Sequence, residues 1–290
     1  MLLELRGIKK KYGNNVALKD FSFSFTPGIY GILGPNGAGK STLINIITGN
    51  LSQSAGVIFL DGENIKSMGK RYYGRIGFMP QQQQMPVGFT LRRFLWYMGG
   101  LKGLDKYETE SEIQSLVKKV NLESDLDKKL TVFSGGMKQR ALLVQAMMGH
   151  PDILILDEPT AGLDPVERVR FRNLVSKVAF EKTVLLATHV VSDIQYVANE
   201  VIVLKKGCIL ESGTPWELCE GLKGKVFEAV VSEKEINEVE KDFKIADMVK
   251  DRDKIRIRII SERKPEEYEY TELKPTLEDV YLALCEPYMM

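Results

Sequence analysis

Cysteine is scarce in this chain of 290 residues: Cys208, Cys219 and Cys285 are scattered and form no CxxC pair. An odd number of separate thiols argues against a disulfide framework and a cysteine metal site, and it fits a reducing compartment. Net charge is also nearly absent, because 40 Lys and Arg residues against 39 Asp and Glu residues leave +1. The net charge therefore gives no strong electrostatic field that would indicate binding of the whole chain to nucleic acid or to a membrane surface.

Long apolar runs are missing as well. Glu4 and the lysines of Lys9–Lys11 leave no apolar signal core at the N-terminus. The longest apolar runs, such as Ile153–Leu156, are far shorter than the ~18 residues that cross a bilayer. We therefore expect the chain to reach a membrane only through a partner. Three lysines without interleaved aromatic residues predict a solvated edge, so we expect no nucleic-acid partner.

The remaining composition is that of a soluble globular protein, with 44% hydrophobic and 27% charged residues. The length fits one large domain or two smaller ones. Apolar and polar residues alternate around Phe21–Phe25, which predicts a half-buried strand, and Ile29–Leu33 predicts a short apolar strand. Further apolar strands are predicted at Ile153–Leu156, Val184–Ala187 and Val201–Leu204. With helical segments between them, they indicate an α/β layer with a mostly parallel sheet.

Between Thr90 and Met148, the spacing of apolar residues changes to that of amphipathic helices. Thr90 is the predicted N-cap of the first helix. Leu91, Phe94, Leu95 and Met98 share one helical face, as do Ile113, Leu116, Val117 and Val120. We interpret residues 90–148 as a helical insertion.

Short, highly charged elements follow Gly213–Pro215. Strands are predicted at Val226–Val231 and Ile255–Ile260, and a helix is predicted over Ser232–Phe243. Thr276–Cys285 predicts a terminal helix whose first residues, Thr276 to Asp279, fit a capping box. We therefore divide the chain into residues 1–215 and a small α+β accessory domain of residues 216–290.

One segment matches the phosphate-binding pattern G-x-x-x-x-G-K-[ST], directly after a predicted strand and before a helical pattern. Its glycines let backbone N–H groups point into a phosphate, and the following helix offers its positive end. Lys40 is expected to reach the β- and γ-phosphates, and Ser41 to bind Mg²⁺. A plain glycine-rich turn is the alternative. The predicted phosphate contacts are Gly34, Pro35, Asn36, Gly37, Ala38, Gly39, Lys40, Ser41 and Thr42.

An acidic pair, Asp157 and Glu158, ends the strand Ile153–Leu156. The carboxyl ends of parallel strands are where α/β sheets bind ligands. We expect Asp157 to hold Mg²⁺, directly or through water, and Glu158 to polarise the attacking water. Alone, the acidic pair is weak evidence for a site, because an exposed strand end would have the same sequence pattern.

Between these two motifs, Ser134-Gly135-Gly136 begins a helical pattern and makes a second anion site. With this motif the sequence resembles the nucleotide-binding subunit of an ATP-binding cassette (ABC) transporter. In that family, Ser134, Gly135 and Gly136 match the signature that closes on the ATP of the other subunit in a head-to-tail dimer. The resemblance implies a P-loop NTPase fold, namely a RecA-like core with an antiparallel β subdomain and a helical insertion. A capped helix without a ligand is the alternative.

Further residues match the family position by position. Tyr12 resembles the aromatic residue that stacks on adenine, with Val16 beside the base. Gln81 resembles the sensor of Mg²⁺ and the γ-phosphate, although the run Gln81–Gln84 leaves the choice of glutamine open. Asp164 resembles the loop that crosses the dimer interface, and His189 resembles the switch histidine at the γ-phosphate. The other histidine, His150, precedes a proline and is expected to be a solvated loop residue.

The resemblance implies an ATP hydrolase that uses ATP and Mg²⁺, forms a dimer with a second copy, and powers a separate membrane permease. The closing segment Pro275–Leu282 resembles that of ABC-2 exporters, which handle drugs, antibiotics, peptides or polysaccharides. The chain is then expected to be cytoplasmic and peripheral on the inner face of the membrane. Two alternatives share the phosphate site: a soluble ABC ATPase without a permease, and a nucleotide-binding regulator that does not hydrolyse.

Overall fold

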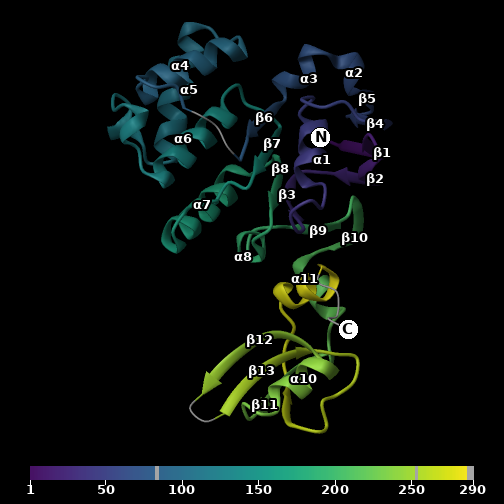
Figure 1. The fold of residues 1–290 in the computed structure, drawn as a ribbon. Coiled ribbons are helices and arrows are strands. Elements are labelled where there is room, and N and C mark those ends of the chain that lie inside the picture. Colours follow the sequence, from purple (N-terminus) through teal and green to yellow (C-terminus); the bar gives the residue numbers. More distant parts are fainter. Residues whose placement is uncertain (82–84, 252–253, 286–290) are drawn as a thin grey trace.

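The computed structural model describes residues 1–81, 85–251 and 254–285. Within these residues the chain forms three β-sheets surrounded by helices (Figure 1). Gln82, Gln83 and Gln84, three of the four candidates for the sensor glutamine, lie outside the described residues.

The central sheet has six strands in the order β10-β9-β3-β8-β7-β6. Five of them run parallel, and β10 pairs antiparallel with β9 at one edge. This confirms the predicted α/β layer. The strands are β3 (Gly28–Leu33), β6 (Ile76–Met79), β7 (Ile153–Asp157), β8 (Thr183–Thr188), β9 (Glu200–Lys205) and β10 (Cys208–Gly213).

Both faces of the central sheet are buried, which explains why its strands read as continuous apolar runs. In β7, Ile153 and Ile155 belong to the core under the antiparallel sheet, whereas Leu154 and Leu156 face the helical side. The alternation places one core on each face of the sheet.

An antiparallel sheet with the strand order β2-β1-β4-β5 covers one core together with α1. Phe21 and Phe25 of β2 are buried and Ser22 and Ser24 are exposed, as the alternation predicted. The elements of this region are β1 (Leu3–Tyr12), β2 (Asn15–Phe25), α1 (Lys40–Ile47), β4 (Ala55–Leu60), β5 (Glu63–Asn64), α2 (Ile65–Met68) and α3 (Lys70–Gly74).

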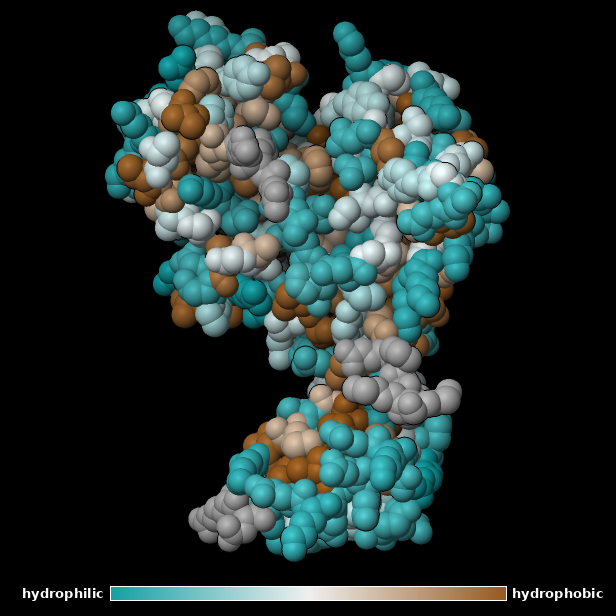
Figure 2. All heavy atoms as spheres, in the orientation of Figure 1, coloured by the Kyte–Doolittle hydropathy of each residue, from teal (hydrophilic) through white to brown (hydrophobic). Residues whose placement is uncertain are grey.

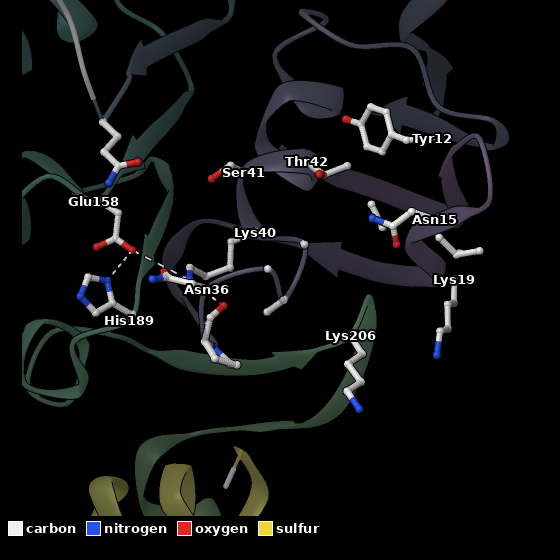
Figure 3. Close-up of a pocket in the computed structure, with 17 residues that line it drawn as sticks. Tyr12, Asn15, Lys19, Asn36, Lys40, Ser41, Thr42, Glu158, His189 and Lys206 are labelled. Atoms are coloured by element: carbon white, nitrogen blue, oxygen red, sulfur yellow. Dashed lines mark hydrogen bonds and ion pairs between the residues drawn. The ribbon is translucent and has the colours of Figure 1, made fainter.

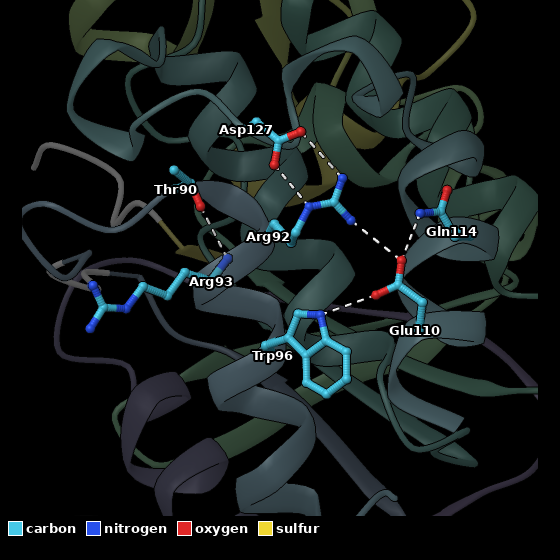
Figure 4. Close-up of polar contacts among 7 residues, drawn as sticks. All are labelled: Thr90, Arg92, Arg93, Trp96, Glu110, Gln114 and Asp127. Atoms are coloured by element: carbon cyan, nitrogen blue, oxygen red, sulfur yellow. Dashed lines mark hydrogen bonds and ion pairs between the residues drawn. The ribbon is translucent and has the colours of Figure 1, made fainter. Parts of the chain in front are cut away.

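Between β6 and β7, the described residues form three α-helices in the predicted helical segment, which lies to one side of the central sheet in Figure 1. Thr90 caps the first helix, because its hydroxyl accepts from the backbone N–H of Arg93 at 3.2 Å. Arg92 bridges Asp127 and Glu110 and so links this helix to the next (Figure 4). The elements are α4 (Leu91–Lys102), α5 (Lys106–Lys119), the 3-10 turns η1 (Glu123–Asp125) and η2 (Leu130–Val132), and α6 (Gly135–Met147).

Beyond β7 the chain forms α7 (Pro165–Val178), α8 (Val191–Ile194) and α9 (Pro215–Glu220). Next comes a third sheet, β12-β13-β11-β14, drawn apart from the central sheet in Figure 1. The elements of this region are β11 (Val226–Val231), α10 (Ile236–Asp242), β12 (Lys244–Asp251), β13 (Lys254–Ile260), β14 (Glu269–Glu272) and α11 (Leu277–Cys285).

The helix predicted from Ser232 is wrong at its start, because α10 begins only at Ile236. The Glu235 carboxylate accepts hydrogen bonds from the Ser232 backbone N–H and hydroxyl, which closes a turn before the helix. The capping box of the last helix is confirmed: the Thr276 N–H donates to Asp279, and the Asp279 N–H donates to the Thr276 hydroxyl.

The last helix, α11, joins two parts of the fold. Leu277 and Val280 pack in the same core as Ile194 and Val201 of the first 215 residues. Its C-terminal carbonyls accept from Lys205 of β9 and from Lys244 of β12. The division at residues 215 and 216 stays a prediction.

No helix in the described ranges is both long and apolar enough to cross a membrane. On the face shown in Figure 2, hydrophobic residues lie in small patches among hydrophilic ones.

Candidate functional site

The phosphate-binding segment connects β3 to α1 at the carboxyl end of the central sheet. Gly37 (φ 79°) and Gly39 (φ 111°) adopt the left-handed conformation that favours glycine. Gly34 is required for space instead, because a Cβ there would lie 2.2 Å from the carbonyl oxygen of Leu204. The glycines therefore serve the curled backbone that the motif predicted.

Lys40 is only 6% exposed, although it carries an ammonium group. Its Nζ donates to the carbonyl of Gly34 at 2.6 Å and lies 3.9 Å from Oε1 of Glu158. Burial lowers the pKa of Lys40, and the charges of Glu158 and Asp157 oppose that shift. The sheet thus brings the lysine and the glutamate together although they are far apart in sequence.

Asp157 ends β7 and is buried. Burial and the neighbouring Glu158 raise its pKa to about 6, while Lys40 and the Ser41 hydroxyl act to lower it. Its Oδ1 is buried without a hydrogen-bond partner in the described part of the chain. A buried carboxylate oxygen with a free acceptor beside a hydroxyl suits a hard divalent cation such as Mg²⁺.

Among the described residues there is no cluster of three or more His, Cys, Asp or Glu side chains that could hold a metal alone. Mg²⁺ is commonly held by one or two protein ligands together with phosphate oxygens and water. Asp157 and Ser41 are thus the protein groups suited to the ion.

Glu158 is buried but faces three polar groups. Nδ1 of His189 lies 2.9 Å from its Oε1, the Thr188 hydroxyl donates to its Oε2 at 3.3 Å, and Lys40 approaches Oε1. Glu158 also has a positive φ of 47°, which is uncommon for a residue other than glycine. Neither Thr188 nor this conformation was predicted from the sequence.

A cavity of about 690 Å³ lies over the phosphate-binding segment. In Figure 3, Glu158, His189 and Lys40 gather on one side, and Tyr12 lies on the other. Gln81 lines the cavity too, which makes it the one candidate glutamine that the structure describes there. The lining residues are Tyr12, Asn15, Val16, Ala17, Lys19, Pro35, Asn36, Gly37, Ala38, Gly39, Lys40, Ser41, Thr42, Gln81, Glu158, His189 and Lys206.

Four lining residues, Asn15, Ala17, Lys19 and Lys206, were not predicted, because no motif marks them. Lys206 is placed by the β9–β10 turn. The next residue, Gly207, donates its N–H to the carbonyl of Ala38 at 2.9 Å and accepts from the N–H of Lys19 at 3.0 Å. The turn therefore ties β2 to the phosphate-binding segment.

Five predicted nucleotide contacts do not line this cavity: Gly34, Ser134, Gly135, Gly136 and Asp164. The predicted metal ligand Asp157 does not line it either. Ser134 and Asp164 each cap a helix: their side chains accept from the N–H groups of Met137 and Glu167. These segments are neighbours, because a Cβ on Gly136 would lie 2.3 Å from the Glu167 carboxylate. Capping accounts for both side chains, and their contact with a second nucleotide stays a prediction.

The other histidine, His150, is exposed as expected, with a side chain 84% accessible, and its Nε2 lies 3.3 Å from Glu112. It takes no part in the cavity.

A glycine-rich turn before a helix, a buried lysine and an acidic strand end define a nucleotide-binding site of the P-loop class. Comparison with known proteins agrees: the model for the ABC transporter family matches residues 18–161. The Nod factor export ATP-binding protein I of Bradyrhizobium diazoefficiens is 36% identical over 217 residues, which cover 74% of this chain and 71% of the relative.

Solved structures give the same result. The cbiO1 protein of Clostridium perfringens, described as part of an ABC transporter complex, has 27% identity and a TM-score of 0.69, covering 82% of this chain and 94% of that one. A bacterial ABC transporter cassette solved as a dimer has 25% identity and a TM-score of 0.65, covering 73% of this chain and 98% of that one.

The chain therefore belongs to the ABC transporter family. This confirms the resemblance drawn from the motifs and the P-loop NTPase fold that it implied. It also confirms the prediction of an ATP-binding ATPase subunit of a transporter.

Proposed function

We propose that this chain is the ATP-hydrolysing subunit of an ABC exporter and works as a dimer with a second copy of itself. The main support for the proposal is that Lys40, Glu158 and His189 lie together at one cavity above the phosphate-binding turn. Lys40 supplies positive charge for the phosphates. Glu158 is proposed to accept a proton from the water that attacks the γ-phosphate.

The nucleotide is proposed to bind with Mg²⁺, held by Asp157 and Ser41, with Gln81 completing the site. The ion supplies positive charge where negative charge develops on the phosphate oxygens. The unpartnered Oδ1 of buried Asp157 supports this assignment. Tyr12 is proposed to stack on adenine, with Val16 beside it, because both line the cavity and Tyr12 lies away from Glu158 and His189 (Figure 3).

Dimerisation is proposed because one chain holds two anion-binding motifs in different places. Ser134–Gly136 and Asp164 lie outside the cavity that holds Lys40. In a head-to-tail dimer, each signature helix would close on the nucleotide of the partner. One sequence carries both halves of the site, so a homodimer is sufficient.

The permease is proposed to contact the surface formed by Gln81 and residues 89–100. Within it, the Arg93 guanidinium stacks 4.4 Å over the Phe89 ring, and Tyr97 is 54% exposed beside Phe89. Behind this surface, Glu110 accepts from Trp96 and Arg92, which fixes α4 on α5 (Figure 4). A movement of this surface on nucleotide binding would therefore carry α4 and α5 together.

Export, rather than import, rests on the relatives named Nod factor export ATP-binding protein I and on the closing segment at Pro275–Leu282. We place the chain on the inner face of the cell membrane, held there by the permease. A soluble ABC ATPase without a permease is the alternative and would share every phosphate-site residue.

The experiment is a pull-down from detergent-solubilised host membranes with tagged Glu158→Gln protein in Mg²⁺ and ATP. We expect this variant to retain ATP, form a closed dimer and recover one stoichiometric protein with about six hydrophobic spans. Lys40→Ala is the control, because it loses a phosphate contact and should form no ATP-dependent dimer. Recovery of soluble partners alone would favour the permease-free ATPase, and wild-type hydrolysis by Glu158→Gln would refute the assigned base.

A further inference from the structure

A third buried acid lies close to Asp157 and Glu158. Asp193, in α8, is 0% exposed. One of its oxygens, Oδ2, accepts a hydrogen bond from the hydroxyl of Thr160, and the other, Oδ1, has no partner within the described residues. A carboxyl group in this position is costly to bury, so its one hydrogen bond needs an explanation.

Thr160 belongs to the turn that follows Glu158. It is 2% exposed and lies between Glu158 and Asp164. The turn is closed by two backbone hydrogen bonds, from Ala161 N–H to the Glu158 carbonyl at 3.1 Å and from Leu163 N–H to the Thr160 carbonyl at 3.1 Å. The Thr160–Asp193 contact fixes this turn through a side chain.

Glu158 needs such support because its φ of 47° is unfavourable for a residue with a Cβ. A conformation of this kind persists only where the surroundings over-determine it. On its N-terminal side, the Glu158 N–H donates to the Ala187 carbonyl at 2.9 Å. On its C-terminal side, the turn is tied to the body of the protein by Asp193.

α8 is also the segment that follows His189. The Asp193 N–H donates to the Val190 carbonyl at 3.1 Å, and the Val190 N–H donates to the Thr188 hydroxyl at 3.0 Å. The segment carrying His189 and the segment carrying Glu158 are therefore joined through Asp193 and Thr160 as well as through the hydrogen bonds of Glu158 itself.

The helix that carries Asp193 is itself held from two sides. Arg172 of α7 donates to the carbonyl of Ser192 and stacks 5.7 Å over the Tyr196 ring. Ile194 packs in the core that also holds Leu277 and Val280 of α11. Asp193 therefore extends from a braced element rather than from a free loop.

We propose that Asp193 is a positioning residue for ATP hydrolysis, which acts through the hydroxyl of Thr160 to hold the Glu158 carboxylate at the angle needed to accept a proton from water. The inference rests on the proposed function of Glu158. Neither Asp193 nor Thr160 lines the cavity, so both act through Glu158 and not on the nucleotide.

The test compares two substitutions at one position in the full chain. Thr160→Val keeps the shape and removes the hydroxyl, whereas Thr160→Ser keeps the hydroxyl. We expect Thr160→Val to lower kcat for ATP by about tenfold or more with KM changed by less than about twofold, since only the reacting geometry is disturbed. We expect Thr160→Ser to restore kcat to within about threefold of wild type.

A purely structural role would give a different pattern. If Thr160→Val and Thr160→Ser have the same kcat, or if Thr160→Val has wild-type kcat, the proposal is wrong. If Thr160→Val does not fold, Thr160→Ala/Asp193→Ala removes both partners and leaves no unpaired carboxyl group. That double variant must fold and show the same selective loss of kcat; unchanged kcat would overturn the proposal.

The proposal can fail separately from the proposed function. Loss of hydrolysis in Glu158→Gln with normal hydrolysis in Thr160→Val would refute only the role of Asp193. Wild-type hydrolysis in Glu158→Gln would refute the assignment of the base itself.

Discussion

Nδ1 of His189 lies 2.9 Å from Oε1 of Glu158, and this contact joins the ends of β8 and β7 at the nucleotide cavity. An ionised carboxylate only accepts hydrogen bonds, so a bond here requires a hydrogen on Nδ1 of the imidazole. The imidazole then orients the carboxylate through this contact. His189 is therefore coupled to Glu158, the proposed base.

Replacing His189 by Ala should lower kcat for ATP by about a hundredfold, because Glu158 loses its orienting partner. Nucleotide affinity should change little, since Lys40 and the phosphate-binding turn stay intact. Steady-state ATPase kinetics and equilibrium nucleotide binding measure the two effects. The matched control is His150→Ala, which removes the chain's other histidine from an exposed position. Equal kcat for the two variants would contradict the expectation.

Asp157 should make stability depend on pH when Mg²⁺ and nucleotide are absent. Its pKa is about 6 in the folded chain against an ordinary value of 3.8, so the folded state holds this proton more tightly than the unfolded chain does. The resulting stabilisation is complete below pH 3.8 and is lost as the pH rises through about 6. Above that pH the ionised, buried carboxylate costs stability.

Asp157→Asn should therefore be more stable than wild type at pH 8 by about 2 to 3 kcal/mol, the free energy equivalent to this shift in pKa. The gain should largely vanish near pH 4, and the variant should not hydrolyse Mg²⁺-ATP. Urea unfolding at both pH values measures the difference. Asp20→Asn, at an exposed position, is the control and should stay within about 0.5 kcal/mol of wild type. Equal pH dependence in Asp157→Asn and wild type would refute the prediction.

Gly34→Ala should destabilise the chain and weaken nucleotide binding, because the new Cβ would meet the Leu204 carbonyl at 2.2 Å. The backbone must shift to relieve that contact, at a cost of about 1 to 3 kcal/mol. Gly74→Ala is the matched control, because a Cβ there has no neighbour within 4 Å and φ is not positive. Thermal unfolding and nucleotide titration compare the two variants; similar behaviour would show that the turn adapts.

Asp279→Asn should lower stability without touching the nucleotide cavity. The Asp279 carboxylate is 1% exposed and accepts from two nitrogens of Arg258, at 2.8 and 2.7 Å. Although burial acts to raise the pKa of Asp279, hydrogen bonds from Arg258 and Thr276 hold it below the ordinary value. This ion pair therefore stabilises the fold above pH 3.8, and its contribution is lost as the pH falls through the lowered pKa.

We expect a loss of about 2 kcal/mol at pH 7 for Asp279→Asn, because the half-buried guanidinium of Arg258 loses the counter-charge of a buried carboxylate. Arg256→Gln on the same strand is the control: its partner Asp251 is 3.7 Å away and both side chains are exposed, so little change is expected. Chemical denaturation at pH 7 ranks the variants. A larger loss in Arg256→Gln would refute the assignment.

The sequence was most informative where residues are buried on both faces or fixed by a motif. β7, β8 and β9 were predictable because their side chains alternate between two cores and must all be apolar. β12 and β14 were not predicted, because most of their side chains are exposed and carry no apolar pattern.

Within the site, motif spacing predicted most of the residues that line the cavity but not how the backbone holds them. The left-handed conformation of Glu158 and the contact between Thr160 and Asp193 arise from three-dimensional packing. No local pattern distinguishes Asp193 from a surface acid at the start of a short helix. The same holds for Lys206, which reaches the cavity because a hairpin turn places it there.

The position of α11 has a consequence for how the chain matures on the ribosome. Leu277 and Val280 complete the core that contains Ile194 and Val201, yet they are synthesised after the whole third sheet. The nascent ATPase core therefore presents an uncovered apolar face while the third sheet is being made. Chaperones that recognise such faces would have their longest opportunity at this stage, and release would follow when α11 emerges and docks.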